Sequence, residues 1–307
     1  MAAVTAALVK QLRDQTGAGM MDCKTALTES AGDFETAVDW LRKKGLAAAA
    51  KKAGRVASQG LVGLEVAGRR GALVEVNSET DFVARNQDFQ TLVRAVARLA
   101  LEVGGDLKRL KAAAVPASGR TVADEITQAI AVIGENINLR RSAAIEVGEG
   151  AIGAYVHGAL APGLGTIGVL VGLQSSGDPE RLAALGKQLA MHVAAAKPQA
   201  VSVERLDAAT LERERAIYAE QARASGKPDG IVDKIVEGRV RKFYEEAVLL
   251  EQAFVIDPDL KVKDAIDRVA EAIGSSIAVT DCVRFALGEG LSGPSSNPEE
   301  VAPLAGT

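Results

Sequence analysis

Hydrophobic residues recur at helical spacing in three short stretches between positions 4 and 41, and polar or glycine-rich segments separate these stretches. We expect Asp22 to cap the second helix and Asp33 to cap the third, because a side-chain oxygen there accepts a hydrogen bond from a free helical N–H group. Gly45 stands where a glycine would end the third helix. The pattern predicts an N-terminal three-helix domain with a helical connector over residues 1–56.

Beyond this domain the pattern changes to strands combined with helices. Apolar runs at 61–67 and 72–77 flank a Gly-Arg-Arg-Gly turn and predict a β-hairpin. Two amphipathic helical patterns and a strand over 139–147 complete a first region. A second hairpin begins at Ala151 and leads to a helix that starts at Asp178, with proline at its first position. The predicted fold class is α+β with small antiparallel sheets.

An internal repeat relates the two regions. Residues 126–150 align without a gap with residues 266–290, an offset of 140 residues. Apolar positions coincide along the helix and the strand, and both segments end in Gly-Glu-Gly. We infer a core of two pseudo-symmetric α+β halves, 57–150 and 151–290.

The second half is longer because it contains two additional helical patterns, 207–224 and 230–247. A short turn with glycine and proline joins them, which favours antiparallel packing of the two helices. The sequence therefore predicts an inserted antiparallel coiled-coil hairpin at about 204–248. Residues 291–307 are rich in Ser, Pro and Gly and predict a flexible C-terminal tail, with one short helix starting at Asn297.

Composition and charge narrow the range of partners. The chain has 36 Lys and Arg against 40 Asp and Glu, and its net charge of −4 gives no general attraction to nucleic acid or anionic membranes. No apolar run reaches membrane-spanning length, no signal peptide is visible, and Cys23 and Cys282 lie far apart. We expect a cytoplasmic protein without direct nucleic-acid or membrane contact, whose partner is a protein or a small molecule.

Signals for catalysis or cofactor binding are weak. Residues 148–153 and 163–168 both match the Gly-x-Gly-x-x-Gly pattern of dinucleotide sites, but strand-like residues follow where such a site needs a helix. His157 and His192 have no cysteine or second histidine at ligand or catalytic spacing, and we expect His192 to be half-buried at a helix end. The sequence predicts a binding protein that is not an enzyme, with no cofactor, no metal and no small-molecule substrate.

Two segments carry large apolar side chains where polar ones are usual. Phe82 and Val83 interrupt the polar stretch 78–86, which connects a strand to a helix. An aromatic ring on such a connection is either folded back onto the core or presented to a partner. The adjacent Met20 and Met21 cannot both face the core of a small helix. We expect one of them to be exposed, either incidentally or as adaptable apolar surface for binding.

These segments resemble the elongation factor Ts family. The run from Leu12 to Lys24, which contains Thr-Gly-Ala-Gly-Met-Met-Asp-Cys-Lys, is similar to the start of that family. Thr80–Arg85 is similar to its central signature, and residues 133–137 and 191–195 also fit, in family order. The resemblance implies a ubiquitin-associated-like three-helix domain, a core of two related halves and a coiled-coil insertion.

The resemblance also implies a function and a partner. It predicts a guanine-nucleotide exchange factor that promotes GDP release from elongation factor Tu during translation elongation, by destabilising the magnesium and phosphate site. By resemblance, one patch docks on the GTPase domain of Tu, a second segment intrudes near the nucleotide, and His192 faces another Tu domain. The docking patch comprises Arg13, Met20, Met21 and the neighbouring Lys24; the intruding segment comprises Thr80, Asp81, Phe82 and Val83.

The three-helix domain leaves another function open. A non-catalytic adaptor could use the three-helix module, residues 1–45, to bind ubiquitin-like or ribosomal partners. A pull-down from cell extract distinguishes the two hypotheses, because a single translational GTPase should dominate for an exchange factor. An enzyme is the third option, and a nucleotide bound to the isolated chain would favour it.

Overall fold

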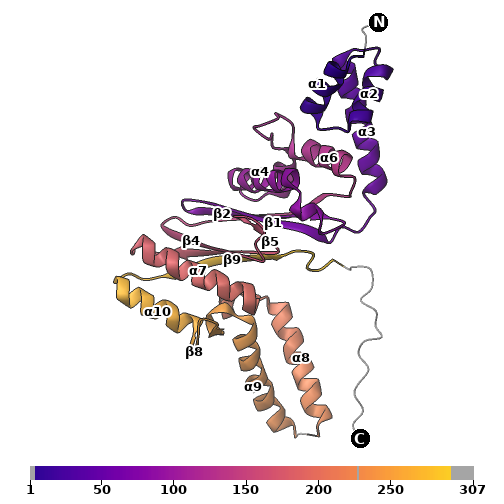
Figure 1. The fold of residues 1–307 in the computed structure, drawn as a ribbon. Helices are drawn as coiled ribbons and strands as arrows, with labels where there is room; N and C mark the ends of the chain where they lie inside the picture. Colours follow the sequence, from indigo (N-terminus) through magenta and orange to yellow (C-terminus); the bar gives the residue numbers. More distant parts are fainter. Residues whose placement is uncertain (1–3, 227, 292–307) are drawn as a thin grey trace, which may run out of the picture. The chain divides into compact units, whose positions relative to one another are not determined.

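The computed structural model describes residues 4–226 and 228–291 (Figure 1), so the predicted tail and the helix expected at Asn297 lie outside the described residues. The protein is α+β, with helices and small antiparallel sheets. Contacts divide the chain into two compact units. Among the described residues, the first unit comprises 4–63, Val74–Ser142 and 286–291, and the second comprises Leu64–Leu73 and Ala143–Phe285.

The first unit begins with three helices, α1 (Ala6–Thr16), α2 (Met20–Glu29) and α3 (Phe34–Lys52). They bury a small apolar cluster at the spacing that the sequence shows, with Leu12, Cys23, Ala26, Leu27 and Ala37 fully enclosed. The predicted cap of α3 is confirmed, since the Asp33 carboxylate accepts a hydrogen bond from the Thr36 N–H at 2.8 Å.

Two expectations about these helices are wrong. Gly19, rather than Asp22, is the N-cap of α2, and Asp22 lies in the first turn, where its carboxylate pairs with Lys44 Nζ at 2.7 Å. Gly45 does not end α3, because the Ala- and Lys-rich sequence that follows continues the helix to Lys52. Gly45 is buried, and a Cβ placed on it would lie 3.4 Å from the Cβ of Ala131 in α6.

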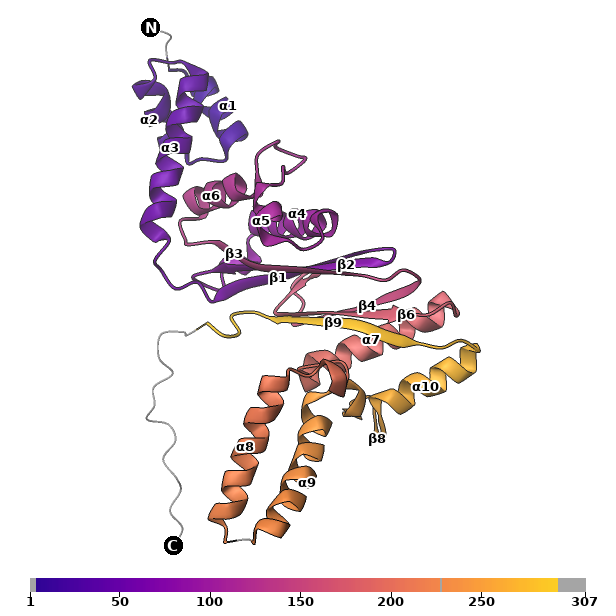
Figure 2. The ribbon, with the colours of Figure 1, turned by 180° about the vertical axis from the view of Figure 1, so that it is seen from behind.

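The chain continues with strands, whose residues 64–73 and 143–146 belong to the second unit, and with three helices that cover the sheet (Figure 2). The elements are β1 (Gln59–Ala67), β2 (Arg70–Ser78), the 3-10 turn η1 (Val83–Arg85), α4 (Gln87–Val103), α5 (Leu107–Ala112), α6 (Val122–Ile133) and β3 (Asn138–Glu146). The sheet has the order β3-β2-β1-β5, where β5 is the short strand Leu164–Gly165. The sequence pattern did not predict α5, which spans only six residues and is too short to show helical periodicity.

The second unit packs helices on a three-stranded sheet of order β4 (Gly150–His157), β6 (Ile167–Gln174) and β9 (Ala278–Ala286). Helix α7 lies on β4 and β6, and α10 lies beside α7 (Figure 1). The predicted start of α7 is confirmed, with Asp178 as N-cap and proline at the first position. The elements are β4 (Gly150–His157), β5 (Leu164–Gly165), β6 (Ile167–Gln174), α7 (Pro179–Ala196), η2 (Val203–Arg205), α8 (Ala208–Ala224), α9 (Asp229–Ala247), η3 (Leu249–Glu251), β7 (Ala253–Phe254), β8 (Asp257–Lys261), α10 (Val262–Ile273) and β9 (Ala278–Ala286).

The repeat seen in the sequence has a structural counterpart. Helix α10 begins and ends 140 residues after α6, and β9 begins and ends 140 residues after β3. Gly134 and Gly274 end the two helices in the left-handed conformation, with φ of 87° and 65°. The strand orders also correspond, because β3-β2-β1 in one sheet matches β9-β6-β4 in the other.

Helices α8 and α9 pack side by side and project together from the second unit (Figures 1 and 2). Their contact buries Ala222, Val232, Val240 and Phe243, while the outer faces are charged. Within residues 4–226 and 228–291, no helix is long and apolar enough to cross a membrane.

Candidate partner-binding surfaces

The connection between β2 and α4 presents Phe82 to solvent. The Phe82 side chain is 77% exposed, whereas the neighbouring Val83 and Ala84 are buried. The 3-10 turn η1 produces this arrangement, because it turns two apolar residues inward and leaves the ring on the outside. The sequence left open whether Phe82 folds back onto the core or is presented at the surface, and the structure shows that it is at the surface.

Hydrogen bonds order this connection despite its exposure. The carbonyl oxygens of Asp81 and Phe82 accept hydrogen bonds from the N–H groups of Ala84 and Arg85, at 3.2 and 3.1 Å. Asn86 then caps α4 by accepting from two N–H groups of its first turn, at 2.8 and 3.1 Å. The ring therefore stands on a short, hydrogen-bonded segment rather than on a loop without internal contacts.

The internal repeat shows that this connection is longer than the fold requires. In the second unit, four residues, 175–178, join β6 to α7. In the first unit, eight residues, 79–86, join the corresponding β2 to α4. Because the shorter connection joins an equivalent strand and helix, the additional residues around Phe82 are available for a role other than connection.

Met20 and Met21 form a second exposed apolar surface at the start of α2. Their side chains are 46% and 70% exposed, so both methionines reach solvent, whereas the sequence led us to expect exposure of one of them. Helix α2 turns Cys23, Ala26 and Leu27 toward the core of the three helices instead. The charged residues Arg13 and Lys24 are also exposed.

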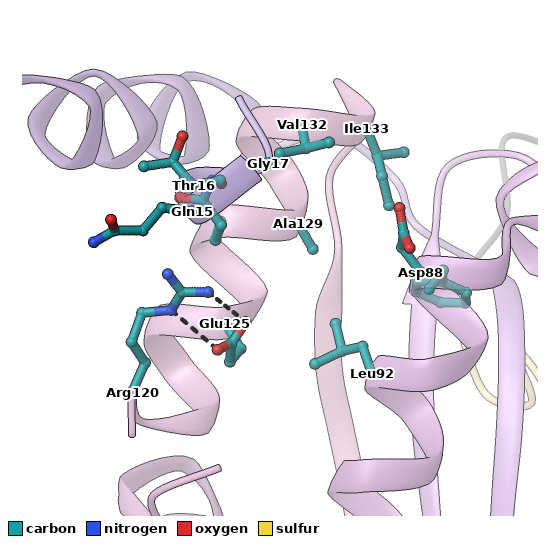
Figure 3. Close-up of a pocket in the computed structure, with 12 residues that line it drawn as sticks. Gln15, Thr16, Gly17, Asp88, Leu92, Arg120, Glu125, Ala129, Val132 and Ile133 are labelled. Atoms are coloured by element: carbon teal, nitrogen blue, oxygen red, sulfur yellow. Dashed lines mark hydrogen bonds and ion pairs between the residues drawn. The ribbon is translucent and has the colours of Figure 1, made fainter. Parts of the chain in front are cut away.

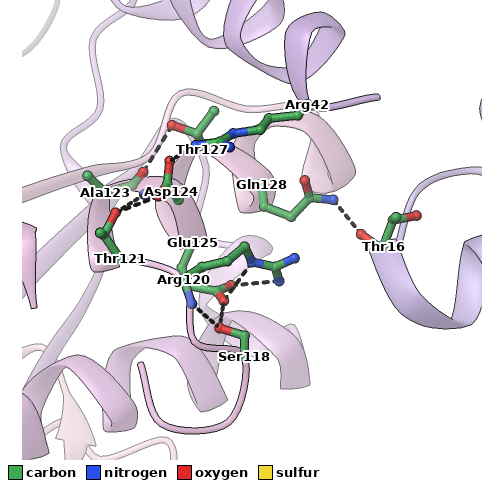
Figure 4. A network of polar contacts seen from close by, with 10 residues as sticks. All are labelled: Thr16, Arg42, Ser118, Arg120, Thr121, Ala123, Asp124, Glu125, Thr127 and Gln128. Carbon is green, nitrogen blue, oxygen red and sulfur yellow. Dashed lines mark hydrogen bonds and ion pairs between the residues drawn. The ribbon is translucent and has the colours of Figure 1, made fainter. Parts of the chain in front are cut away.

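Polar contacts join α1 and α3 to α6 in the same unit (Figure 4). The Gln128 amide donates a hydrogen bond to the carbonyl oxygen of Thr16, at the end of α1. The Arg42 guanidinium of α3 pairs with Asp124 at 3.4 Å. Both contacts come from α6, so this helix holds the end of α1 and the middle of α3.

A cavity of about 230 Å³ lies beside these contacts, between the end of α1 and helices α4 and α6 (Figure 3). At its edge Arg120 and Glu125 pair at 3.0 Å, so each charge already has a partner. Within the described part of the chain, no group of three His, Cys, Asp or Glu side chains could hold a metal ion.

His192 of α7 is fully buried, so the expectation of a half-buried side chain is wrong. Its Nδ1 accepts a hydrogen bond from the Val255 N–H at 3.1 Å, and its Nε2 lies 2.8 Å from Gln252 Oε1. Because Nδ1 is an acceptor, Nε2 carries the proton and donates to Gln252. Burial lowers the pKa of His192, and the hydrogen bond to Gln252 opposes this effect without cancelling it.

The residues that His192 supports are themselves exposed. Val255 and Ile256 form the turn between β7 and β8, with side chains 49% and 44% exposed. Neither residue was predicted from the sequence as part of a binding surface. The available signal was an apolar pair immediately before Asp257-Pro258, at a position where turns are usually polar.

An α+β chain with large apolar side chains exposed on ordered segments has the features of a protein that recognises partners through its surface. Comparison with known proteins specifies the family. A family model described as Elongation factor TS matches residues 79–289. Elongation factor Ts of Rhodospirillum centenum is 56% identical over all 307 residues and over the whole relative. Elongation factor Ts of Rhodospirillum rubrum is 60% identical over 95% of this chain and 94% of the relative. The chain therefore belongs to the elongation factor Ts family.

Proposed function

We propose that this protein accelerates GDP release from elongation factor Tu by inserting the exposed ring of Phe82 near the nucleotide site. The chain is a nucleotide exchange factor for Tu in translation elongation, a role that relatives 55% to 60% identical over nearly the whole chain support. The observation that carries the mechanism is the 77% exposed Phe82 ring on an ordered connection. An exposed ring on a fixed backbone can fill a partner pocket with little loss of conformational entropy.

The exchange follows from thermodynamic linkage and needs no covalent step. If binding of this chain weakens GDP on Tu, GDP weakens binding of this chain by the same factor. A ring inserted between elements of Tu would displace the loops that hold magnesium and phosphate. Loss of these contacts removes strong electrostatic stabilisation of GDP. The acid Asp81, next to Phe82 and also exposed, would add negative charge beside that site.

The remaining site residues divide into contact and support residues. We propose that Arg13, Met20, Met21 and Lys24 form the docking patch on the GTPase domain. Thr80 and the buried Val83 hold the connection from within, so their role is to support Phe82. His192 acts on Tu indirectly, by holding the exposed turn at Val255 and Ile256.

We also propose a division of the chain into domains. We assign residues 1–56 to a ubiquitin-associated-like domain and the two halves of the core to 57–150 and 151–290. The projecting α8 and α9 form a coiled-coil hairpin within 204–248, and most of the segment 291–307 lies outside the described residues. The protein acts in the cytoplasm as a binding factor and not as an enzyme. The adaptor alternative is not favoured, because the relatives match along the whole chain and not in the three-helix domain alone.

Timed release of labelled GDP from Tu, with and without this protein, tests the function. Phe82→Ala should lower the maximal stimulated release rate by about tenfold or more, the loss expected for a central aromatic contact. The free energy of unfolding should stay within about 0.5 kcal/mol, since the ring contributes little burial. Leu46→Ala, at a side chain 51% exposed on α3, is the matched control and should leave release unchanged. Equal release by the parent and Phe82→Ala would remove Phe82 from the mechanism.

A further inference from the structure

The segment that follows α6 holds the connection that carries Phe82. After Gly134 ends α6, both carboxylate oxygens of Glu135 accept hydrogen bonds from Thr80, two residues before Phe82. Oε2 accepts from the Thr80 N–H at 2.9 Å, and Oε1 accepts from the Thr80 hydroxyl at 2.6 Å. A carboxylate that accepts two short hydrogen bonds from one residue fixes both the position and the direction of that residue.

A second carboxylate makes the contact reciprocal. Glu79 Oε1 accepts a hydrogen bond from the Asn136 N–H at 2.6 Å, so each segment binds a backbone N–H of the other. The Asn136 side chain donates to the carbonyl oxygen of Arg55 at 2.8 Å, and the Arg55 guanidinium lies 3.5 Å from Glu79. Glu79 is 22% exposed at its side chain, so water screens these hydrogen bonds only in part.

The position of the Phe82 ring is fixed mainly by the backbone of the connection that carries it. Because Phe82 is 77% exposed, contacts of the ring with its own chain contribute little to its placement. At its C-terminal end the connection is held by Val83 and the Asn86 cap. At the other end it is held by Thr80, whose carbonyl oxygen also accepts from the Ser78 hydroxyl at 2.9 Å. Without Glu135, Thr80 would lose both of these hydrogen bonds to the segment after α6.

We propose that Glu135 is a positioning residue that holds the Phe82 connection in its protruding conformation before Tu binds, with Glu79 as the reciprocal contact. The inference rests on the proposed function of Phe82 and extends it. When only a fraction of molecules has the competent conformation, the apparent affinity for a partner falls by that fraction. Loss of Glu135 should therefore raise the concentration of this protein that gives half-maximal GDP release, while the rate at saturation is retained.

Hydrogen–deuterium exchange of the free full-length chain tests the structural part without Tu. Glu135→Ala should accelerate exchange at the amides of residues 80–86 by about tenfold, given the strength of hydrogen bonds to charged groups. Glu135→Gln keeps one oxygen acceptor, so its exchange rates at these amides should be intermediate between those of Glu135→Ala and the parent. Thr80→Val removes only the hydroxyl donor while conserving shape, and should accelerate the same amides with little risk to folding. Glu102→Ala, at an exposed carboxylate of α4, is the control and should change nothing. Unchanged protection in both Glu135→Ala and Thr80→Val would overturn the inference.

A double-mutant cycle tests whether Glu135 acts through Phe82. In the parent background, Glu135→Ala should raise the half-maximal concentration for GDP release by about tenfold. In the Phe82→Ala background it should add little, because the group that it positions is absent. An equal effect in both backgrounds would contradict a role through Phe82. If Phe82→Ala itself leaves release unchanged, the proposed function fails, and the exchange measurement on the free chain still decides whether Glu135 holds the connection.

Discussion

Gly153 of β4 and Gly186 of α7 bring strand and helix into direct backbone contact. A Cβ placed on Gly153 would lie 2.2 Å from the carbonyl oxygen of Gly186, and a Cβ on Gly186 would lie 2.7 Å from the Gly153 Cα. The contact explains one of the two glycine patterns in the sequence. Gly153 ends the pattern 148–153, and there glycine permits the approach of a helix to a sheet and not of a phosphate.

Alanine at position 153 should therefore destabilise the second unit. Gly153→Ala introduces a clash with backbone atoms that cannot move independently, and we expect a loss of about 1–3 kcal/mol or more. Gly45→Ala is the matched control inside α3, where the added methyl group has ordinary contact distance to Ala131. That change should be neutral or should stabilise by up to about 1 kcal/mol through helix propensity. Urea denaturation measures the free energy of unfolding of both variants. A Gly153→Ala variant as stable as the parent would contradict the close contact between Gly153 and Gly186.

Removal of the exposed methionine surface should weaken the complex with Tu. Met20→Ala with Met21→Ala should raise the dissociation rate by about tenfold or more, since changes at an interface act mainly on dissociation. Both side chains are exposed, so the free energy of unfolding should hardly change. Replacement of both by Leu retains apolar surface and should keep most of the affinity. Stopped-flow dissociation provides the measurement, and an unchanged rate would show that the patch does not contact Tu.

Buried His192 should make stability depend on pH. Its pKa in the folded chain lies below the ordinary value of 6.5, so the unfolded chain binds the proton more readily. Neutral His192 therefore makes its full contribution to the free energy of unfolding above pH 6.5. This contribution is lost as the pH falls toward the pKa of the folded state, at no more than ~1.4 kcal/mol per pH unit. His192→Gln should flatten this part of the profile. Denaturation between pH 5 and 7, roughly the range where histidine titrates, measures how the free energy of unfolding changes with pH. Equal slopes in parent and variant would contradict the role given to His192.

Removal of the buried carboxylate of Glu75 should be among the most damaging changes. Burial by itself would raise the pKa of Glu75, but hydrogen bonds to the carboxylate hold that pKa below its ordinary value. Glu75→Ala should cost about 3–5 kcal/mol, because it leaves buried donors and positive charge without this partner. The exposed Glu102→Ala should stay within about 0.5 kcal/mol of the parent in the same denaturation experiment. The carboxylate accepts from Asn77 Nδ2 and Arg140 Nη1 at 3.0 Å and from the Gly288 N–H at 2.8 Å, and it pairs with Arg141.

Local patterns predicted the elements well where a helix or strand was long enough to show a period. The caps at Asp33 and Asp178 could be predicted because a cap depends on the residues next to it in the chain. The 140-residue repeat could be found because it needs only a comparison of the sequence with itself. Gly45 was misinterpreted because the sequence does not show that α6 lies against it. The six-residue α5 was missed for a different reason, since its apolar residues cannot display a period.

The sequence by itself determined the α+β class, the repeat and the segments that interrupt polar stretches with apolar side chains, because period, caps and composition are local properties. Only the tertiary structure decided which of these side chains reach solvent. Phe82 and the methionine pair face outward, whereas His192 is enclosed and Glu135 holds Thr80 from 55 positions away. Exposure and such hydrogen bonds depend on which distant segments pack together, and that information is not contained in any short stretch of the chain.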